Sequence, residues 1–278
     1  MKLVQVFLKR GGFMAEKLVI ASSAKEAAAL KNSKSAFLAG GTEDNRLNSS
    51  VDAKTLISIG RIAELDGITK KDGSIRIGAM TTFQEMLDSS LVPDYLKDAC
   101  RFMGSRTKRN MATIGGNIAS KRTDSYLYPT LIASHASFEL MDAKGEVCEK
   151  CACCYLKHYD ELKDCLILSV SVPQKANVAS KRYANTVQSH AVLTVSVGDV
   201  DGKIRVGVAA KNAALKSLCD ISAALSQKNL SDEEIKKMIE ADKDLRFEKD
   251  IFGSPEYKSY LLAVTIADLA KKVKGGKR

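Results

Sequence analysis

Two pairs of adjacent glycines interrupt apolar runs of the sequence and carry polar residues on their rims. They lie in residues 37–45 (FLAGGTEDN) and 111–120 (MATIGGNIAS). Glycine lacks a Cβ, so it can adopt a positive φ and lets a ligand lie against the backbone. Successive amide N–H groups in such a turn form a concavity that binds anions, often a diphosphate. The pattern predicts two anion-binding turns, with side-chain hydrogen bonds added by Thr42, Thr113 and Asn117.

Neither glycine pair belongs to a standard nucleotide-binding fingerprint. Their surroundings match neither G-x-G-x-x-G nor G-x-x-x-x-G-K-[ST]. A plain tight turn is therefore the alternative interpretation of each pair.

The cysteines are the second feature that could do chemistry. Four of the seven fall within seven positions: Cys148, Cys151, Cys153 and Cys154. Four thiolates within reach of one another could hold an iron–sulfur cluster or zinc. If Cys153 and Cys154 lie on a strand, however, their side chains alternate and cannot easily face one metal. We therefore favour unliganded thiols, with an extra iron–sulfur cluster as the alternative. The odd number of cysteines is also a poor disulfide framework.

Composition and charge narrow the class of protein. The 278 residues are 45% hydrophobic and 27% charged, which is typical of a globular chain that buries a core. The net charge of +10 is spread along the sequence, and only residues 271–278 form a dense basic tail, so no nucleic-acid-binding arm is indicated. No apolar run approaches the roughly 18 residues of a membrane span, and residues 1–17 do not resemble a signal peptide. We expect a cytoplasmic protein with no nucleic-acid or membrane partner.

Strands, helices and turns must position the glycine pairs. Residues 16–45 read as strand, helix and strand, with Ser22-Ser23 capping an alanine-rich helix and the second strand ending at the first pair. A hairpin turn is predicted at 70–73. Thr81-Thr82 cap an amphipathic helix over 83–87, upstream of the second pair.

The C-terminal part of the chain reads as a separate unit of an α+β protein. The strand over 166–172 ends at Pro173, which is an edge-strand signal, and the composition shift at 174–181 marks a boundary. Beyond it the pattern predicts two strands joined at Asp201-Gly202 and mostly helix over 213–274.

The order and spacing of these motifs resemble the FAD-binding (medium) subunit of the xanthine dehydrogenase and carbon monoxide dehydrogenase family of molybdenum hydroxylases. The resemblance extends over about residues 15–272. It is carried by segments 37–42, 56–59, 62–65, 75–82, 109–119, 129–133, 168–173, 244–246 and 253–258.

This resemblance implies a vanillyl-alcohol-oxidase-like (PCMH-type) FAD-binding fold. It has two α/β lobes and a C-terminal lobe in which helices accompany a small antiparallel sheet. The FAD-binding domain would span residues 1–173, with lobes at about 15–70 and 71–173. A domain like that of the carbon monoxide dehydrogenase flavoprotein would span 174–278.

The resemblance also implies a function, an oxidoreductase subunit that binds FAD non-covalently. Such a subunit relays electrons between a [2Fe–2S] ferredoxin-like subunit and a soluble acceptor such as NAD(H), while a molybdopterin-binding subunit acts on the substrate. The residues that it assigns to the cofactor are Leu38, Ala39, Gly40, Gly41, Thr42, Glu43, Thr82, Thr113, Ile114, Gly115, Gly116, Asn117 and Asp124.

The chain departs from the family pattern near the expected flavin. Tyr126 stands where the family usually has an acidic residue; Asp124 could replace that residue or could merely cap the next helix. Asn185 and Gln188 stand where the family commonly has a Lys and an Arg. The missing cations would lower the flavin potential. The departures from the family pattern, taken together, make NAD a doubtful acceptor. A divergent scaffold subunit that has lost flavin binding is the alternative function.

Overall fold

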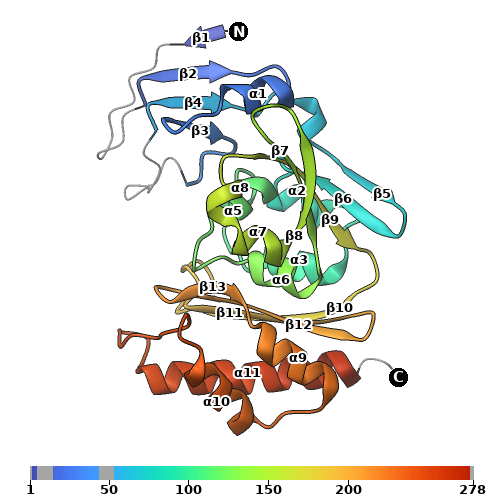
Figure 1. The fold of residues 1–278 in the computed structure, drawn as a ribbon, viewed down its shortest axis with the longest axis vertical. Coiled ribbons are helices and arrows are strands. Elements are labelled where there is room, and N and C mark those ends of the chain that lie inside the picture. The colour runs from blue at the N-terminus through green and yellow to red at the C-terminus, as the bar shows by residue number, and fades with distance from the viewer. Residues whose placement is uncertain (1, 5–14, 44–52, 276–278) are drawn as a thin grey trace.

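Three β-sheets follow one another along the long axis of the molecule in a computed structural model of the chain (Figure 1). The structure describes residues 2–4, 15–43 and 53–275. The first sheet lies at the N-terminal end and the third packs on the C-terminal helices. The second sheet and its helices lie between them.

The first sheet contains the predicted strand–helix–strand opening. Its order is β1-β2-β4-β3, with β2 and β3 parallel to β4 and β1 antiparallel to β2. The elements are β1 (Lys2–Val4), β2 (Lys17–Ile20), α1 (Ala24–Leu30), β3 (Ser35–Leu38) and β4 (Thr55–Ser58). Ser23 caps α1 by accepting a hydrogen bond from the Glu26 amide. Because β3 ends at Leu38, the first glycine pair follows it directly.

The second sheet is antiparallel, in the order β5-β6-β9-β7-β8. A 3-10 helix, η1 (Ala63–Leu65), precedes this sheet in the chain. The strands are β5 (Ile68–Lys71), β6 (Ser74–Gly78), β7 (Ser137–Met141), β8 (Val147–Cys151) and β9 (Leu166–Pro173). The predicted hairpin is confirmed, since Asp72 and Gly73 both have positive φ, 48° and 76°. The edge-strand prediction for β9 is wrong, because β9 pairs on both sides. Pro173 is tolerated because it occupies the last position of the strand.

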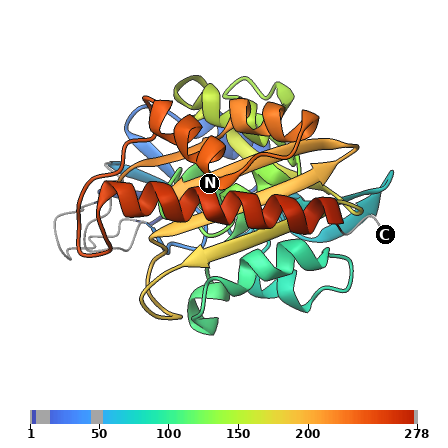
Figure 2. The ribbon, with the colours of Figure 1, turned by 90° about the horizontal axis from the view of Figure 1, so that it is seen from below.

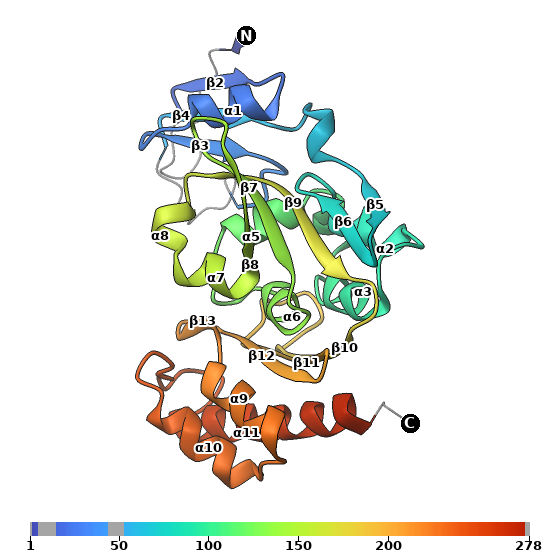
Figure 3. The same ribbon diagram turned by 45° about the vertical axis from the view of Figure 1, so that its right-hand side comes forward.

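Short helices cover one face of this second sheet (Figure 3). They are α2 (Phe83–Asp88), α3 (Asp94–Arg101), α4 (Arg106–Arg109), α5 (Ile114–Ala119), α6 (Tyr128–Ala133), α7 (Ala152–Lys157) and α8 (Tyr159–Leu162). Strand side chains alternate, so Ile77, Phe138 and Val170 are buried in the same core as these helices. The opposite face is polar.

The third sheet is antiparallel in chain order, and three helices cover one of its faces. Its elements are β10 (Asn177–Tyr183), β11 (Leu193–Val200), β12 (Lys203–Ala210), β13 (Ala214–Ser217), α9 (Cys219–Gln227), α10 (Asp232–Ala241) and α11 (Pro255–Gly275). Figure 2 shows α11 lying across this sheet. No helix in the described ranges is long and apolar enough to cross a membrane.

Two of these strands differ from the sequence prediction. No strand was expected at 174–181, where the composition shift marked a boundary, yet residues 177–183 form β10, which pairs with β11 over its whole length. Residues 214–217 were expected to be mostly helical, yet they form β13. Both are edge strands with mixed polar residues, so their periodicity is weak. The predicted turn at Asp201-Gly202 is confirmed by positive φ at both residues, 54° and 80°.

Helix α6 joins the second sheet's helices to the third sheet. A Cβ on Gly207 of β12 would lie 2.5 Å from the carbonyl oxygen of Pro129, and a Cβ on Gly198 of β11 would overlap that of Ala133. The two glycines therefore let the helix backbone rest directly on the strands. Between them, the hydroxyl of Thr130 bonds that of Ser196 at 3.0 Å.

This close packing predicts that Gly207→Ala destabilises the protein. The added methyl group must displace the Pro129 carbonyl, and such overpacking costs about 1–3 kcal/mol. Gly60→Ala is the matched control, because a Cβ on Gly60 meets nothing within 4 Å. Urea unfolding of both variants measures the difference. Equal unfolding midpoints would contradict the role assigned to Gly207.

Candidate functional site

The first glycine pair lies against the segment that precedes the second pair. A Cβ on Gly40 would overlap the carbonyl oxygen of Met111, so only glycine permits this approach of two backbones. Gly41 has a positive φ of 67°, as the sequence predicts for a glycine turn. The two predicted loops therefore meet, although they are far apart in the sequence.

The loop after β3 offers free backbone donors. Within the described part of the chain, no hydrogen bond uses the amide N–H of Gly40, Gly41 or Thr42. Gly41 is buried and Thr42 is exposed. Successive free amides next to a left-handed residue form an anion-binding concavity, so this loop has the chemistry that the sequence suggested.

The second pair behaves differently, and the expectation of positive φ there is wrong. Gly115 and Gly116 lie in the first turn of α5 and have no positive φ. The amide of Gly115 donates to the Ala79 carbonyl at 2.9 Å, and that of Gly116 donates to Thr113 Oγ1 at 3.1 Å. The amides of Ile114 and Asn117 are also bonded to backbone carbonyls. These donors are used to start the helix and are not available to an anion.

The glycines of α5 are needed for space. A Cβ on Gly115 would lie 2.8 Å from both the Cβ and the carbonyl oxygen of Ala79. A Cβ on Gly116 would lie 3.0 Å from Thr113 Oγ1 and 4.0 Å from the Ala39 Cβ. Gly116 is only half-buried, so its bare backbone faces the gap between the two segments.

A cleft of about 300 Å³ opens between these segments. The predicted residues that line it are Gly41, Thr42, Glu43, Gly116, Asn117 and Asp124. The other predicted residues do not line it and lie in the elements around it: Leu38, Ala39, Gly40, Thr82, Thr113, Ile114 and Gly115. Lining residues that the site prediction missed are Met103, Lys108, Met111, Ala112, Ser120, Arg122, Ser125, Tyr126 and His190.

Two threonines fix the start of α5. Thr82 caps α2 through a reciprocal capping box with Glu85. It also forms an isolated antiparallel bridge with Thr113, which caps α5. Thr82 thus holds the second segment in place without lining the cleft itself.

Arg122 connects the two sides of the cleft. Its guanidinium binds Asp124 in a bidentate manner (Nε···Oδ1 2.7 Å, Nη2···Oδ2 2.6 Å) and reaches Glu43 at 3.0 Å. Burial alone would lower the pKa of Arg122, but the two carboxylates together hold it above its ordinary value. The cleft therefore contains a permanent cation that is partly neutralised by its neighbours.

The sequence left two roles open for Asp124, and the capping role is wrong. The N-cap of α6 is Leu127, without a side-chain hydrogen bond. Ser125 Oγ instead accepts from the amide of Tyr128. The Asp124 side chain is only 7% exposed, lies 3.3 Å from His190 Nδ1 and faces the cleft.

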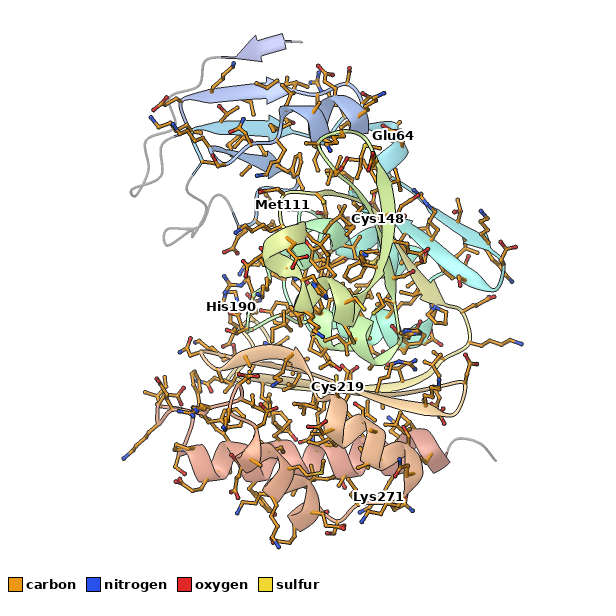
Figure 4. All side chains as sticks on the ribbon, viewed as in Figure 1. Glu64, Met111, Cys148, His190, Cys219 and Lys271 are labelled. Carbon is orange, nitrogen blue, oxygen red and sulfur yellow. The ribbon has the colours of Figure 1, made fainter. Side chains whose placement is uncertain are left out.

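Aromatic and amide groups complete the cleft. Tyr126 stacks on His190 with ring centroids 6.3 Å apart, and the Arg182 guanidinium lies 5.3 Å from the Tyr126 centroid. Burial raises the pKa of Tyr126, so the phenol is neutral at physiological pH. Figure 4 places His190 and Met111 on the same side of the molecule. The side-chain oxygen of Asn117 (Oδ1) accepts a hydrogen bond from the Ser125 hydroxyl. The side-chain nitrogen of Asn117 (Nδ2) makes no hydrogen bond among the described residues.

The four clustered cysteines are not arranged as metal ligands. Cys148 lies on β8 and Cys151 caps α7. Cys153 and Cys154 lie in α7, so the condition considered above, that these two lie on a strand, is not met. Across the described ranges, no three His, Cys, Asp or Glu side chains are placed to hold a metal ion. The alternative of an iron–sulfur cluster therefore lacks a converging set of ligands there.

Comparison with known proteins places the chain in a family. Residues 13–175 match the family described as FAD binding domain in molybdopterin dehydrogenase. The Escherichia coli K12 protein "Uncharacterized protein YgfM" is 32% identical over 243 residues, 84% of this chain and 85% of that protein. The xanthine dehydrogenase FAD-binding subunit of E. coli O157:H7 is 36% identical over 121 residues, 41% of each chain.

Solved structures share the mixed α/β fold. Carbon monoxide dehydrogenase from Hydrogenophaga pseudoflava superimposes with a TM-score of 0.77 at 22% identity, covering 93% of this chain and 96% of that chain. Quinoline 2-oxidoreductase from Pseudomonas putida 86 gives 0.76 at 19% identity, covering 98% and 100%. The resemblance read from the motifs is confirmed, and the chain belongs to the family of FAD binding domains in molybdopterin dehydrogenases.

Proposed function

We propose that the protein is the FAD-binding, electron-transfer subunit of a molybdenum hydroxylase complex. One observation carries the proposal, the cleft in which the free amides of residues 40–42 lie opposite the start of α5, in a chain of this family. Its partners would be a [2Fe–2S] ferredoxin-like subunit and a molybdopterin-binding subunit, in the cytoplasm.

The residues present fit a dinucleotide held without a covalent bond. The amides of Gly41 and Thr42 would bind the diphosphate, and Lys108, which makes none of the ion pairs in the described ranges, would add a positive charge. Asn117 would donate its side-chain amide to the cofactor. The side chains of Met103 and Met111 would exclude water from the cleft. When bound, FAD supplies one- and two-electron redox chemistry, and the protein supplies position and electrostatics.

The charges at the cleft bear on the electron acceptor. Asn185 and Gln188, the neutral residues that replace the expected cations, are exposed and do not line the cleft. Arg122, which is half-buried, is instead a cation at the cleft, and Glu43 and Asp124 already share it. An electron-rich flavin is therefore stabilised less, which lowers the flavin potential and makes the reduced flavin a stronger reductant. These charges therefore do not oppose NAD(H) as the soluble acceptor.

We further propose that the fold is of the PCMH type. The two α/β lobes would be the first sheet with α1, at about residues 15–70, and the second sheet with its helices, at about 71–173. The cleft lined by Gly41 and Gly116 would lie at their junction. Residues 174–278 would form the C-terminal domain.

Purification under flavin-replete conditions tests the proposed function. We expect the protein to show the absorption spectrum of oxidised flavin and to release FAD, identified by mass spectrometry, on denaturation. The alternative of a scaffold subunit predicts a colourless protein that does not take up FAD in a fluorescence titration. That result would overturn the proposal.

Replacing Gly41 tests the diphosphate loop. We expect Gly41→Val to weaken FAD binding by about tenfold or more, equivalent to at least about 1.4 kcal/mol, because a side chain blocks the free amides. Gly73→Val is the matched control, since Gly73 also has a positive φ (76°) but lies in the β5–β6 hairpin. Both variants carry similar backbone strain. Equal FAD affinity of the two proteins in a titration would contradict the assignment.

Removing the Arg122 charge tests the electrostatics of the cleft. Arg122→Gln leaves the carboxylates of Glu43 and Asp124 without their cation, so we expect FAD, a dianion, to bind about tenfold more weakly. Arg76→Gln is the control, because Arg76 pairs with Glu139 (3.2 Å) on the polar face of the second sheet, away from the cleft. FAD titrations at two salt concentrations measure both variants. An equal response of the two would argue against the role of Arg122.

A further inference from the structure

Two thiols meet at the start of α7, outside the cleft. Cys151 is the last residue of β8 and the N-cap of α7, and Cys154 is the third residue of that helix. The amide of Cys154 donates a hydrogen bond to Cys151 Sγ at 3.2 Å. The two cysteines therefore lie on one face of the helix start, with their side chains adjacent.

This arrangement is compatible with a disulfide. Residues three apart at a helix start lie on one face, and Cys151 and Cys154 have the Cys-x-x-Cys spacing of redox-active dithiols. Cys154 is exposed and Cys151 is half-buried, so a small reagent can reach the pair.

The two sulfurs have different environments. The Cys151 sulfur accepts a hydrogen bond from the Cys154 amide. The hydrogen bond with the Cys151 sulfur raises the pKa of the Cys154 thiol, followed by a smaller effect of burial, so Cys154 keeps its proton. Cys151 is thus the sulfur with a backbone donor in place, and Cys154 is the protonated reserve.

We propose that Cys151 and Cys154 form a redox-active dithiol that exchanges with low-molecular-weight disulfides. The Cys151 thiolate attacks one sulfur of the disulfide; an S–S bond breaks, and the first thiolate leaves and takes up a proton. Cys154 then loses its proton and attacks Cys151 Sγ of the mixed disulfide, which expels the second thiolate. The protein loses two electrons and two protons, and the reagent is reduced to two thiols. This activity does not depend on the cofactor cleft.

The neighbouring cysteine provides a contrast. Cys153, between the pair, packs against the core around the second sheet, and burial raises its pKa to about 11. Cys153 therefore stays protonated near neutral pH, although it is half-buried like Cys151. It is a matched control within the same helix.

Glutathione disulfide is the probe that tests the dithiol. The full-length protein is reduced, freed of reductant and incubated with the probe, and then analysed by intact mass and peptide mapping. We expect the wild-type protein and Cys153→Ser to carry a Cys151–Cys154 disulfide with no glutathione on either of these two cysteines, while the exposed Cys148 and Cys219 are mapped separately. Cys154→Ser should retain one glutathione on Cys151, because the resolving thiol is gone.

Two outcomes would overturn the proposal. One is a wild-type protein in which Cys151 and Cys154 stay reduced, or in which either of them keeps glutathione as a mixed disulfide. The other is a disulfide that maps to Cys153 or that persists in Cys154→Ser. Cys151→Ser should abolish formation of the disulfide while keeping the fold, because serine is itself a good helix N-cap, and circular dichroism verifies that each variant is folded.

Discussion

The backbone of Gly40 lies against the carbonyl group of Met111, and the cleft depends on this approach. No side chain fits between them, so the end of β3 reaches the segment that leads into α5. Gly41 and Gly116 can then line one cavity, although Gly41 lies in the loop after β3 and Gly116 lies in helix α5. Any side chain at residue 40 would separate the two segments.

The two glycine pairs have different tasks. The first leaves its amides free and turns through a left-handed residue. The second pair uses its amides to start α5 and to bond Ala79, so these amides are not available to a ligand. Its lack of side chains leaves room between the two segments. Arg122 joins the two sides because it bonds Glu43 from the first segment and Asp124 beyond the second. The first glycine pair would thus bind an anion through its free amides, and the second pair would leave space for the ligand.

Close backbone contact recurs where α6 meets the third sheet. Gly198 and Gly207 let this helix rest on β11 and β12. The loop after β10 is thereby positioned so that His190 reaches the cleft beside Tyr126. The loop between β10 and β11 of the third sheet therefore contributes His190 to the cleft.

Local sequence patterns were enough to predict the family, the opening strand–helix–strand unit, the hairpins at Asp72-Gly73 and Asp201-Gly202, and the left-handed Gly41, because turns and glycine conformations depend on neighbouring residues. Edge strands β10 and β13 were not predicted, since their pairing comes from other strands. The internal use of the α5 amides and the contact of Arg122 with Glu43 became visible in the folded chain. Such hydrogen bonds and ion pairs join residues distant in the chain, so no local pattern encodes them.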